Sequence, residues 1–183
     1  MSRKPAPLTP LSDALFDELL VILVQQGDQK AFERLHQRWN PRLLKAARRY
    51  TGDGELACDL VQECWMGIWK GINGLSSPAQ FRSYAFSVLH RRGSDAIKRA
   101  IKARARSTDA AADDATSPAL QDEKSTLSNA FATLPPDQRL AAHLHFVEGL
   151  TLAEIARAQS IPLGTAKTRL FHARRKLKAA LAD

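Results

Sequence analysis

One stretch of this chain, residues 151–178, constrains the fold more than any other, because it predicts two helices joined by a tight turn. Thr151 and Glu154 have the T-x-x-E spacing of a capping box, which satisfies free N–H groups at a helix start. The first helix is expected to bury Leu152, Ile155 and Ala156. It breaks at residues 160–162, and Pro162 suits the first turn of the next helix, where its missing N–H costs nothing.

The second predicted helix has an apolar stripe on one side and positive charge on the other. The stripe consists of Ala166, Leu170, Ala173, Leu177 and Leu181, which repeat at three- and four-residue steps. The residues that project opposite it are Thr168, Phe171, His172 and Arg175. Between Pro162 and Lys178 there are six Lys or Arg residues and no acidic residue. This pattern favours a helix-turn-helix that binds DNA, and the alternative is a solvated basic helix packed on a bundle.

The net charge of +8 and the pI near 9.9 predict an anionic partner, either nucleic acid or a membrane surface. This charge is distributed unevenly along the chain. Residues 82–106 hold eight basic side chains against Asp95 alone, whereas residues 108–125 hold five acidic side chains against Lys124. Two basic blocks separated by an acidic one indicate two anion-binding surfaces on one chain.

The sequence lacks the signals of an enzyme, a metal site or a membrane span. It has no phosphate-binding glycine loop and no nucleophile elbow. His143 and His145 lie two residues apart on a predicted helix, which points their rings apart, so no metal site is expected. Cys58 and Cys64 lie on different sides of one predicted helix and are expected to be free thiols. No apolar run approaches the roughly 20 residues that cross a bilayer. A cytoplasmic protein without cofactor, metal or enzymatic activity is therefore predicted.

The fold class predicted from the whole sequence is all-α, with two small helical domains. Residues 1–12, which contain three prolines, are expected to form a mobile tail. Helical periodicity follows at about 13–26, 31–50, 55–70 and 80–105, and no alternating strand pattern is present. In the first of these segments Leu15, Leu19, Ile22 and Leu23 recur at helical spacing. Residues 105–124, rich in Ala, Asp, Ser and Thr, are expected to be a flexible linker to the second helical domain.

Two segments, in this order, resemble conserved regions of bacterial sigma factors. Asp59-Leu-Val-Gln-Glu-Cys-Trp-Met-Gly-Ile-Trp69 is similar to the helix of region 2. Leu134-Pro-Pro, Glu148-Gly-Leu-Thr-Leu-Ala-Glu-Ile-Ala and Pro162-Leu-Gly-Thr-Ala-Lys-Thr-Arg are similar to region 4. With only these two regions and a short linker, the chain resembles the extracytoplasmic-function (ECF) class. The resemblance implies region 2 over residues 13–104 and region 4 over residues 125–183.

The resemblance implies that the helix over residues 55–70 docks the clamp helices of the RNA polymerase β′ subunit. The residues concerned are Asp59, Gln62, Glu63, Trp65 and Trp69. The spacing agrees, because Asp59, Gln62 and Trp69 share a helix face, with Trp65 at its edge. A tryptophan among carboxylate and amide neighbours suits an interface, where large aromatic residues carry much of the binding energy. The alternative is that the tryptophans are core residues, and one of the two is expected to be.

The basic helix after Phe81 and the loop before it are implied to bind the −10 promoter element. The residues concerned are Asn73, Gln80, Tyr84, Arg91, Arg92 and Lys98. Arg and Lys there can hold phosphates, and the loop over residues 73–80 is implied to form a pocket for an unstacked base. The alternative for the basic residues is a solubilising face. Tyr84 stands where the family often has Trp, and Arg91 where it often has Asn, so the −10 preference of relatives is not carried over.

The second helix of the helix-turn-helix is implied to read the −35 element. The residues concerned are Thr165, Lys167, Thr168, Arg169, Phe171, His172 and Arg175. Phe171 also lies on the outer face derived from spacing, where an aromatic ring suits a thymine methyl group or a sugar. Arg169 lies nearer the buried side, where it pairs with Glu154 or contacts DNA. Ser160 replaces the Gly often found in this turn, which predicts slight strain.

Together these observations predict a promoter-specificity subunit that binds core RNA polymerase through the β′ clamp helices and the β flap. It would read both promoter elements and promote strand separation. An anti-sigma factor is expected as a further partner, because the family usually has one. A stand-alone helix-turn-helix regulator is the first alternative; it predicts dimerisation on a palindrome and leaves the tryptophan face without a purpose. An adaptor protein whose basic faces are incidental is the second.

Overall fold

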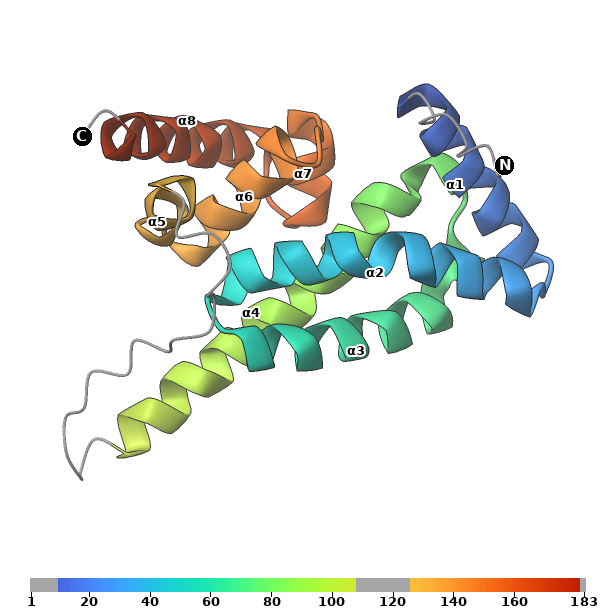
Figure 1. The fold of residues 1–183 in the computed structure, drawn as a ribbon, viewed down its shortest axis with the longest axis horizontal. Coiled ribbons are helices and arrows are strands. Elements are labelled where there is room, and N and C mark those ends of the chain that lie inside the picture. Colours follow the sequence, from blue (N-terminus) through green and yellow to red (C-terminus); the bar gives the residue numbers. More distant parts are fainter. Residues whose placement is uncertain (1–9, 108–125, 182–183) are drawn as a thin grey trace, which may run out of the picture.

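The computed structural model describes residues 10–107 and 126–181, and every regular element within these ranges is helical. The first range contains α1 (Pro10–Gln25), α2 (Gln29–Thr51), α3 (Gly54–Gly71) and α4 (Phe81–Ser107), with two short 3₁₀ turns, η1 (Ile72–Gly74) and η2 (Pro78–Gln80), before α4. The second range contains α5 (Thr126–Ala132), α6 (Pro136–Phe146), α7 (Leu152–Ala158) and α8 (Leu163–Ala180). Figure 1 shows α2, α3 and α4 as one bundle, with α5–α8 lying above it. The all-α prediction is confirmed.

Local capping signals set the helix boundaries in the first half of the chain. Gly27 adopts a left-handed φ of 92°, and Asp28 then caps α2 by accepting from the N–H groups of Lys30 and Ala31. Gly52 ends α2 with a φ of 73°, and Asp53 caps α3 in the same way as Asp28 caps α2. The helix breaks predicted at these two positions are confirmed.

The outer limits of the predicted segments shift by a few residues. Helix α1 begins at Pro10, so residues 10–12 are helical and not part of the tail. Helix α4 continues to Ser107, so residues 105–107 are helical and not part of the linker. The rest of the predicted tail (1–9) and linker (108–124) lies outside the described residues. No helix within the described ranges is long and apolar enough to cross a membrane.

Helix α1 packs through a different face from the one that its most regular apolar spacing suggests. Leu15, Leu19 and Ile22 are exposed, whereas Leu20 and Val21 are fully buried. The buried side also holds Asp17, which is 8% exposed and accepts from Arg38 Nε at 2.8 Å. Burial of a carboxylate is tolerated here because a guanidinium of α2 pairs with it.

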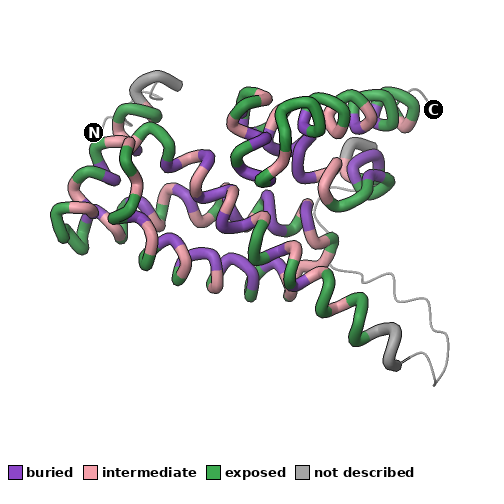
Figure 2. The backbone as a smooth tube through the Cα atoms, turned by 180° about the vertical axis from the view of Figure 1, so that it is seen from behind, coloured by how far each residue is buried: buried purple, intermediate pink, exposed green. Residues whose placement is uncertain are grey.

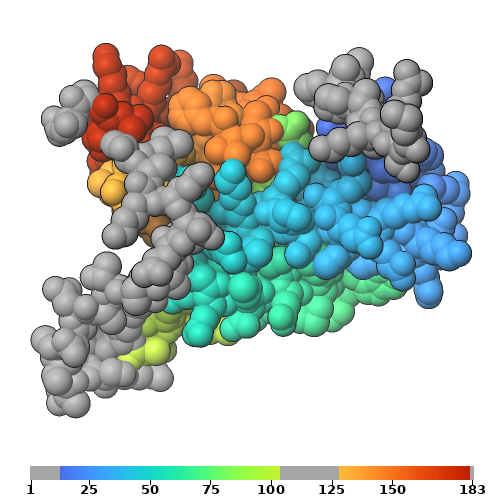
Figure 3. Space-filling model, viewed as in Figure 1, coloured from blue at the N-terminus to red at the C-terminus, as the bar shows by residue number. Residues whose placement is uncertain are grey.

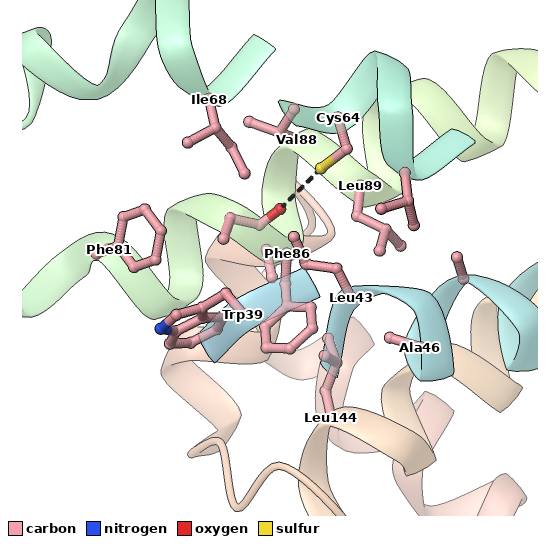
Figure 4. Packing of buried hydrophobic residues seen from close by; sticks show 14 of the residues in the cluster. Trp39, Leu43, Ala46, Cys64, Ile68, Phe81, Phe86, Val88, Leu89 and Leu144 are labelled. Carbon is pink, nitrogen blue, oxygen red and sulfur yellow. Dashed lines mark hydrogen bonds between the residues drawn. The ribbon is translucent and has the colours of Figure 1, made fainter. Parts of the chain in front are cut away.

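The two halves of the chain share one continuous core. Helix α6 packs on α2, and α7 packs on α4. Figure 2 shows buried stretches of both halves facing one another, and in the close-up Leu144 of α6 points into the same cluster as Leu43 of α2 and Phe86 of α4 (Figure 4). All three side chains are completely buried. A second, small cluster around Phe131 and Leu134 joins α5 to α8.

Helix α4 passes very close to α2 at Gly93. A Cβ atom at Gly93 would lie 2.6 Å from Tyr50 Cε1 of α2, so no larger residue fits at this crossing. The C-terminal end of α4 projects from the bundle (Figure 1). In this part of α4, Lys98, Arg99 and Lys102 are exposed.

Candidate nucleic-acid and polymerase interfaces

One face of α3 is exposed and combines acidic, amide and aromatic groups. Asp59 and Gln62 are exposed, Met66 is 58% exposed and Trp69 is 51% exposed. Trp65, in contrast, is only 7% exposed and belongs to the core. The structure thus separates the two tryptophans, and it places Trp65 beneath the face and not on it.

Helix α2 supports both tryptophans with three side chains spaced four residues apart. The Phe32 ring stands edge-on to Trp69, with the ring centroids 4.5 Å apart, and also contacts Trp65 at 5.8 Å. His36 lies 4.5 Å from the Trp65 ring, and Asn40 Oδ1 accepts a 3.0 Å hydrogen bond from Trp65 Nε1. The sequence reasoning missed Phe32 and His36 as site residues. Their four-residue spacing, which matches that of the two tryptophans, is the signal that could have found them.

A groove of about 340 Å³ lies between α3 and α4 beside this face. Its acidic rim is formed by Asp59 and Glu63 of α3, and its basic rim by Arg99 of α4. Arg99 Nη2 lies 3.9 Å from Glu63 Oε1. The floor is apolar, with Leu60 and Ala96 among the lining residues. The groove can therefore accept small apolar side chains between two charged rims.

The residues predicted for the −10 element lie along α4 and the turns that precede it. Arg91, Arg92 and Lys98 are exposed on α4, and Asn73 and Gln80 are exposed on η1 and η2. Tyr84 is half-buried, and its hydroxyl donates to the Gly67 carbonyl of α3 at 3.3 Å. Burial raises the pKa of Tyr84, so the phenol stays neutral. Five of the six predicted residues are thus exposed, and Tyr84 is half-buried against α3.

The predicted helix-turn-helix is formed by α7 and α8. Thr151 Oγ1 accepts from the Glu154 N–H at 3.3 Å, and Glu154 Oε2 accepts from the Thr151 N–H at 2.8 Å, which confirms the capping box. Ser160 has a φ of 52°, in the left-handed region that favours glycine, so the predicted strain in the turn is also confirmed. Pro162 occupies the N-cap of α8, one residue before the first turn in which it was predicted.

Helix α8 presents its predicted reading residues to solvent. Thr165, Lys167, Thr168, Phe171 and Arg175 are exposed, and His172 is half-buried. The Phe171 ring is 62% exposed and packs edge-on against His172 at 5.6 Å. Ala166, Ala173 and Leu177 are buried as predicted, but Leu181 is 48% exposed because it forms the C-cap, beyond the last packed turn.

Comparison with known proteins identifies both halves of the chain. The model of sigma-70 region 2 matches residues 35–105, and the model of sigma-70 region 4 matches residues 125–177. The chain belongs to the sigma-70 family. The ECF RNA polymerase sigma-E factor of Escherichia coli K12 is 28% identical over 179 residues, covering 90% of this chain and 93% of the relative. The RNA polymerase sigma-H factor of Pseudomonas aeruginosa PAO1 is 29% identical over 180 residues, with the same coverage.

Two solved structures share the fold of this sigma factor. RpoE of Bartonella quintana, solved with the anti-sigma factor NepR, matches with a TM-score of 0.69 at 22% identity over 84% of this chain and 98% of that one. CnrH, solved with the cytosolic domain of CnrY, matches with a TM-score of 0.65 at 22% identity over 91% and 97%. The region matches and the relatives identify the chain as a transcription initiation factor of the ECF class. A stand-alone helix-turn-helix regulator would leave the region 2 match unexplained.

Within region 4, Arg169 does not pair with Glu154, which is engaged in the capping box. Its Nη2 atom instead lies 2.8 Å from Asp137 Oδ2, and its Nη1 atom donates to Gln159 Oε1 at 2.9 Å. Of the two alternatives that the sequence left open for Arg169, the Glu154 pair is therefore wrong, because the acidic partner comes from the start of α6. Arg169 braces α6, α7 and α8 together in this sigma factor.

The two cysteines of region 2 are free thiols with opposite environments. Cys58 is exposed on α3, one residue before Asp59, whereas Cys64 is buried with its Sγ 3.8 Å from the Ala85 carbonyl oxygen. Burial raises the pKa of the Cys64 thiol to about 12, although the charge of Arg92 opposes this shift. Cys64 is consequently an apolar packing residue.

Proposed function

We propose that this sigma factor docks core RNA polymerase through the exposed face of α3. The contact residues are Asp59, Gln62, Glu63 and Trp69, and Trp65 is buried beneath this face against the same Phe32 ring that contacts Trp69. The observation that carries the proposal is the half-exposed Trp69 ring, which Phe32 holds edge-on at 4.5 Å. A large ring left half in water by the folded chain gains most from burial against a partner. The β′ clamp helices are the proposed partner, with the β flap contacting region 4.

The −10 element is assigned to α4 and the turns before it. Arg91, Arg92 and Lys98 would hold phosphates, because they are exposed cations on one projecting helix. Asn73 and Gln80 would line the pocket for an unstacked base. Tyr84 is proposed at the edge of that pocket, where its ring is half-exposed and its hydroxyl is anchored to α3. Strand separation then requires no catalysis, and the protein acts by binding alone.

The −35 element is assigned to α8. Lys167, Thr168, Phe171 and His172 are the proposed base readers, and Thr165 and Arg175 are proposed contacts flanking them. The exposed Phe171–His172 pair supports this assignment, since a 62% exposed aromatic ring opposite a buried stripe suits a thymine methyl group. Arg169 is half-buried, with 23% of its side chain accessible, and would reach DNA only by leaving Asp137.

Regions 2 and 4 are proposed to be separate functional units over residues 13–104 and 125–183, joined by the linker over 105–124. We also propose an anti-sigma factor as a partner, because the solved relatives RpoE and CnrH were each captured with such a protein or with a cytosolic domain. A cytoplasmic location follows from this role, since RNA polymerase and the promoter are there.

Run-off transcription with purified core polymerase tests the proposal. The chain is expected to give a defined transcript from a subset of templates in a genomic promoter library, and core polymerase alone is expected to give none. A result in which no template yields a transcript that depends on this chain would overturn the proposed function.

A further inference from the structure

A pocket of about 480 Å³ lies where segments from both halves of the chain meet. It is lined from α1, α2, α4 and the turn between α6 and α7. In the space-filling view, orange atoms of the second half lie directly against the blue atoms of α2 (Figure 3). The volume falls in the range of small-molecule sites, roughly 300–1,000 Å³. No residue proposed above to contact polymerase or promoter DNA lines this pocket, so the proposed function leaves it unassigned.

Arginines of α2 pair with the carboxylates at this pocket. Arg38 binds both aspartates that line it from α1, at 2.8 and 3.2 Å. Glu148 Oε2 accepts from Arg42 Nε at 2.9 Å and from Arg42 Nη2 at 2.6 Å. The third arginine of the pocket, Arg82, donates to the Glu148 carbonyl oxygen and forms no ion pair with any residue that the structure describes. Arg82 therefore brings to the pocket a positive charge that lacks a carboxylate partner in the described chain.

Two buried N–H donors at the pocket lack an acceptor. They are Trp39 Nε1 and Arg82 Nε, neither of which has a hydrogen-bond partner among the described residues. Trp39 is only 1% exposed, and in the close-up its indole nitrogen points away from Leu43 and Phe86 (Figure 4). The other buried tryptophan, Trp65, does have a partner for its indole N–H. Because a buried donor has lost its bonds to water, an acceptor that enters the pocket gains by satisfying these two groups.

Trp39, Arg42 and Arg82 lie together at one end of the pocket. Arg42 and Arg82 both contact Glu148, the first at its carboxylate and the second at its backbone carbonyl. The Arg42 guanidinium lies over the Trp39 ring, 4.0 Å from the ring centroid. Two guanidinium groups and an indole N–H offer only donors, and hydrogen bonds from a cation to an oxyanion are stronger than those between neutral groups. This end of the pocket therefore fits a carboxylate or a phosphate group.

We propose that the pocket binds a small organic acid, whose carboxylate or phosphate group accepts hydrogen bonds from Trp39 Nε1 and Arg82 Nε. Arg42 and Arg82 are half-buried, so rotation of these long side chains admits the acidic group. Asp13, whose side chain is 48% exposed, lines the α1 side, so a ligand that also carries hydroxyl groups fits better than a hydrocarbon acid. A ligand that binds only the folded chain raises its free energy of unfolding. This site does not depend on the proposed polymerase and promoter contacts.

NMR of the indole N–H groups tests the site directly. The chain has three tryptophans, so the ¹⁵N–¹H spectrum of the full chain holds three indole signals, and Trp39→Phe identifies that of Trp39. The probes are glycerol phosphate and glycerate, which are a phosphate monoester and a carboxylate, and each is titrated at constant ionic strength against chloride. Glycerol, which has the hydroxyl groups without the acid, is the control.

The Trp39 signal should move and saturate with at least one of the two acids, because its N–H gains an acceptor. It should not move with glycerol, and the signals of Trp65 and Trp69 should not move with any probe. A response to one acid alone shows which acidic group the site prefers. No saturable shift of the Trp39 signal with either acid, or equal shifts of all three signals, would overturn the proposal.

Two variants test the assigned donors. Arg82→Gln removes the charge and should weaken binding of the acid by at least about tenfold, because charge-assisted hydrogen bonds are the stronger ones. Arg34→Gln, the same change at an exposed position of α2, should bind as wild type does. Signals of Trp65 and Trp69 at their wild-type positions show that Arg82→Gln is folded.

Trp39→Phe provides a second measurement if Arg82→Gln does not fold. It removes only the indole donor and keeps an aromatic ring beneath Arg42. Isothermal titration calorimetry with the same acid should show binding at least about threefold weaker than in wild type, with wild-type helix content by circular dichroism. Wild-type affinity in either variant, once it is shown to be folded, contradicts the site.

Discussion

Replacing Trp69 by alanine should weaken binding of core polymerase and leave the protein folded. A tryptophan side chain covers 150–250 Å² when it is fully buried. With 51% of Trp69 still exposed, about 100 Å² remains available to a partner. At about 25 cal/mol per Å², complete burial of that area gives about 2.5 kcal/mol. The Cβ atom that alanine retains lowers the loss to about 2 kcal/mol, which is about 30-fold in Kd.

The cost to folding comes from the buried half of the same ring. Its area against Phe32 and neighbouring groups is also about 100 Å², so unfolding should become easier by about 2 kcal/mol. For a chain of this length that lowers Tm by about 4–8 °C and leaves the protein folded at 25 °C. Leu15→Ala is a matched control, because Leu15 is 58% exposed on α1, away from the α3 face.

Fluorescence anisotropy of labelled full-length chain, titrated with core polymerase, measures the Kd. Binding to an isolated −35 duplex is measured in parallel. Trp69→Ala should lose about 30-fold toward polymerase and less than twofold toward the duplex, while Leu15→Ala should change neither. A polymerase Kd within threefold of wild type in a folded Trp69→Ala variant would refute the reasoning. A parallel loss in both assays would show a general folding defect.

Three further outcomes are expected. His172→Ala should change discrimination at one −35 base pair, whereas Lys178→Ala should weaken binding to all sequences equally and flatten its salt dependence; duplex titrations at several salt concentrations separate them. Ser160→Gly should raise the free energy of unfolding by about 1 kcal/mol in urea melts, because its φ of 52° is strained for serine, and a decrease would contradict this. At pH 8, the exposed Cys58 should react with a thiol reagent within minutes. Cys64, whose thiol has a pKa of about 12, should react only on unfolding. Mass spectrometry of samples taken at intervals measures the extent of modification at each cysteine.

The features predicted correctly from sequence are those whose causes lie within a turn or two. The capping box needs only Thr151 and Glu154, and the strain at Ser160 follows from one side chain in one turn. The exposed face of α8 follows from the spacing of small and apolar residues along a single helix. Such signals are local, so a few neighbouring residues are enough to predict them.

The features that sequence could not supply depend on partners far along the chain. Helix α1 carries apolar residues on more than one side, so spacing alone cannot decide whether Leu15 or Leu20 is buried. Arg169 pairs with Asp137, which no local pattern connects to it. The contact between regions 2 and 4 could not be predicted from sequence for the same reason, because Arg42 and Glu148 are 106 residues apart. Trp65 and Trp69 resemble each other in sequence context, and only the packing against α2 separates them.

Helix α4 approaches α2 closely at Gly93, so a small tilt of α4 at this crossing produces a larger displacement at its C-terminal end. The part of α4 beyond Gly93 is about 20 Å long at 1.5 Å per residue, so a tilt of about 10° at the crossing moves its end by about 3.5 Å and Lys98 by about 1 Å. A hydrogen bond to a phosphate tolerates only a few tenths of an ångström. If α4 binds the promoter as proposed, the packing of Gly93 against the Tyr50 ring contributes to the alignment of Lys98 with a phosphate.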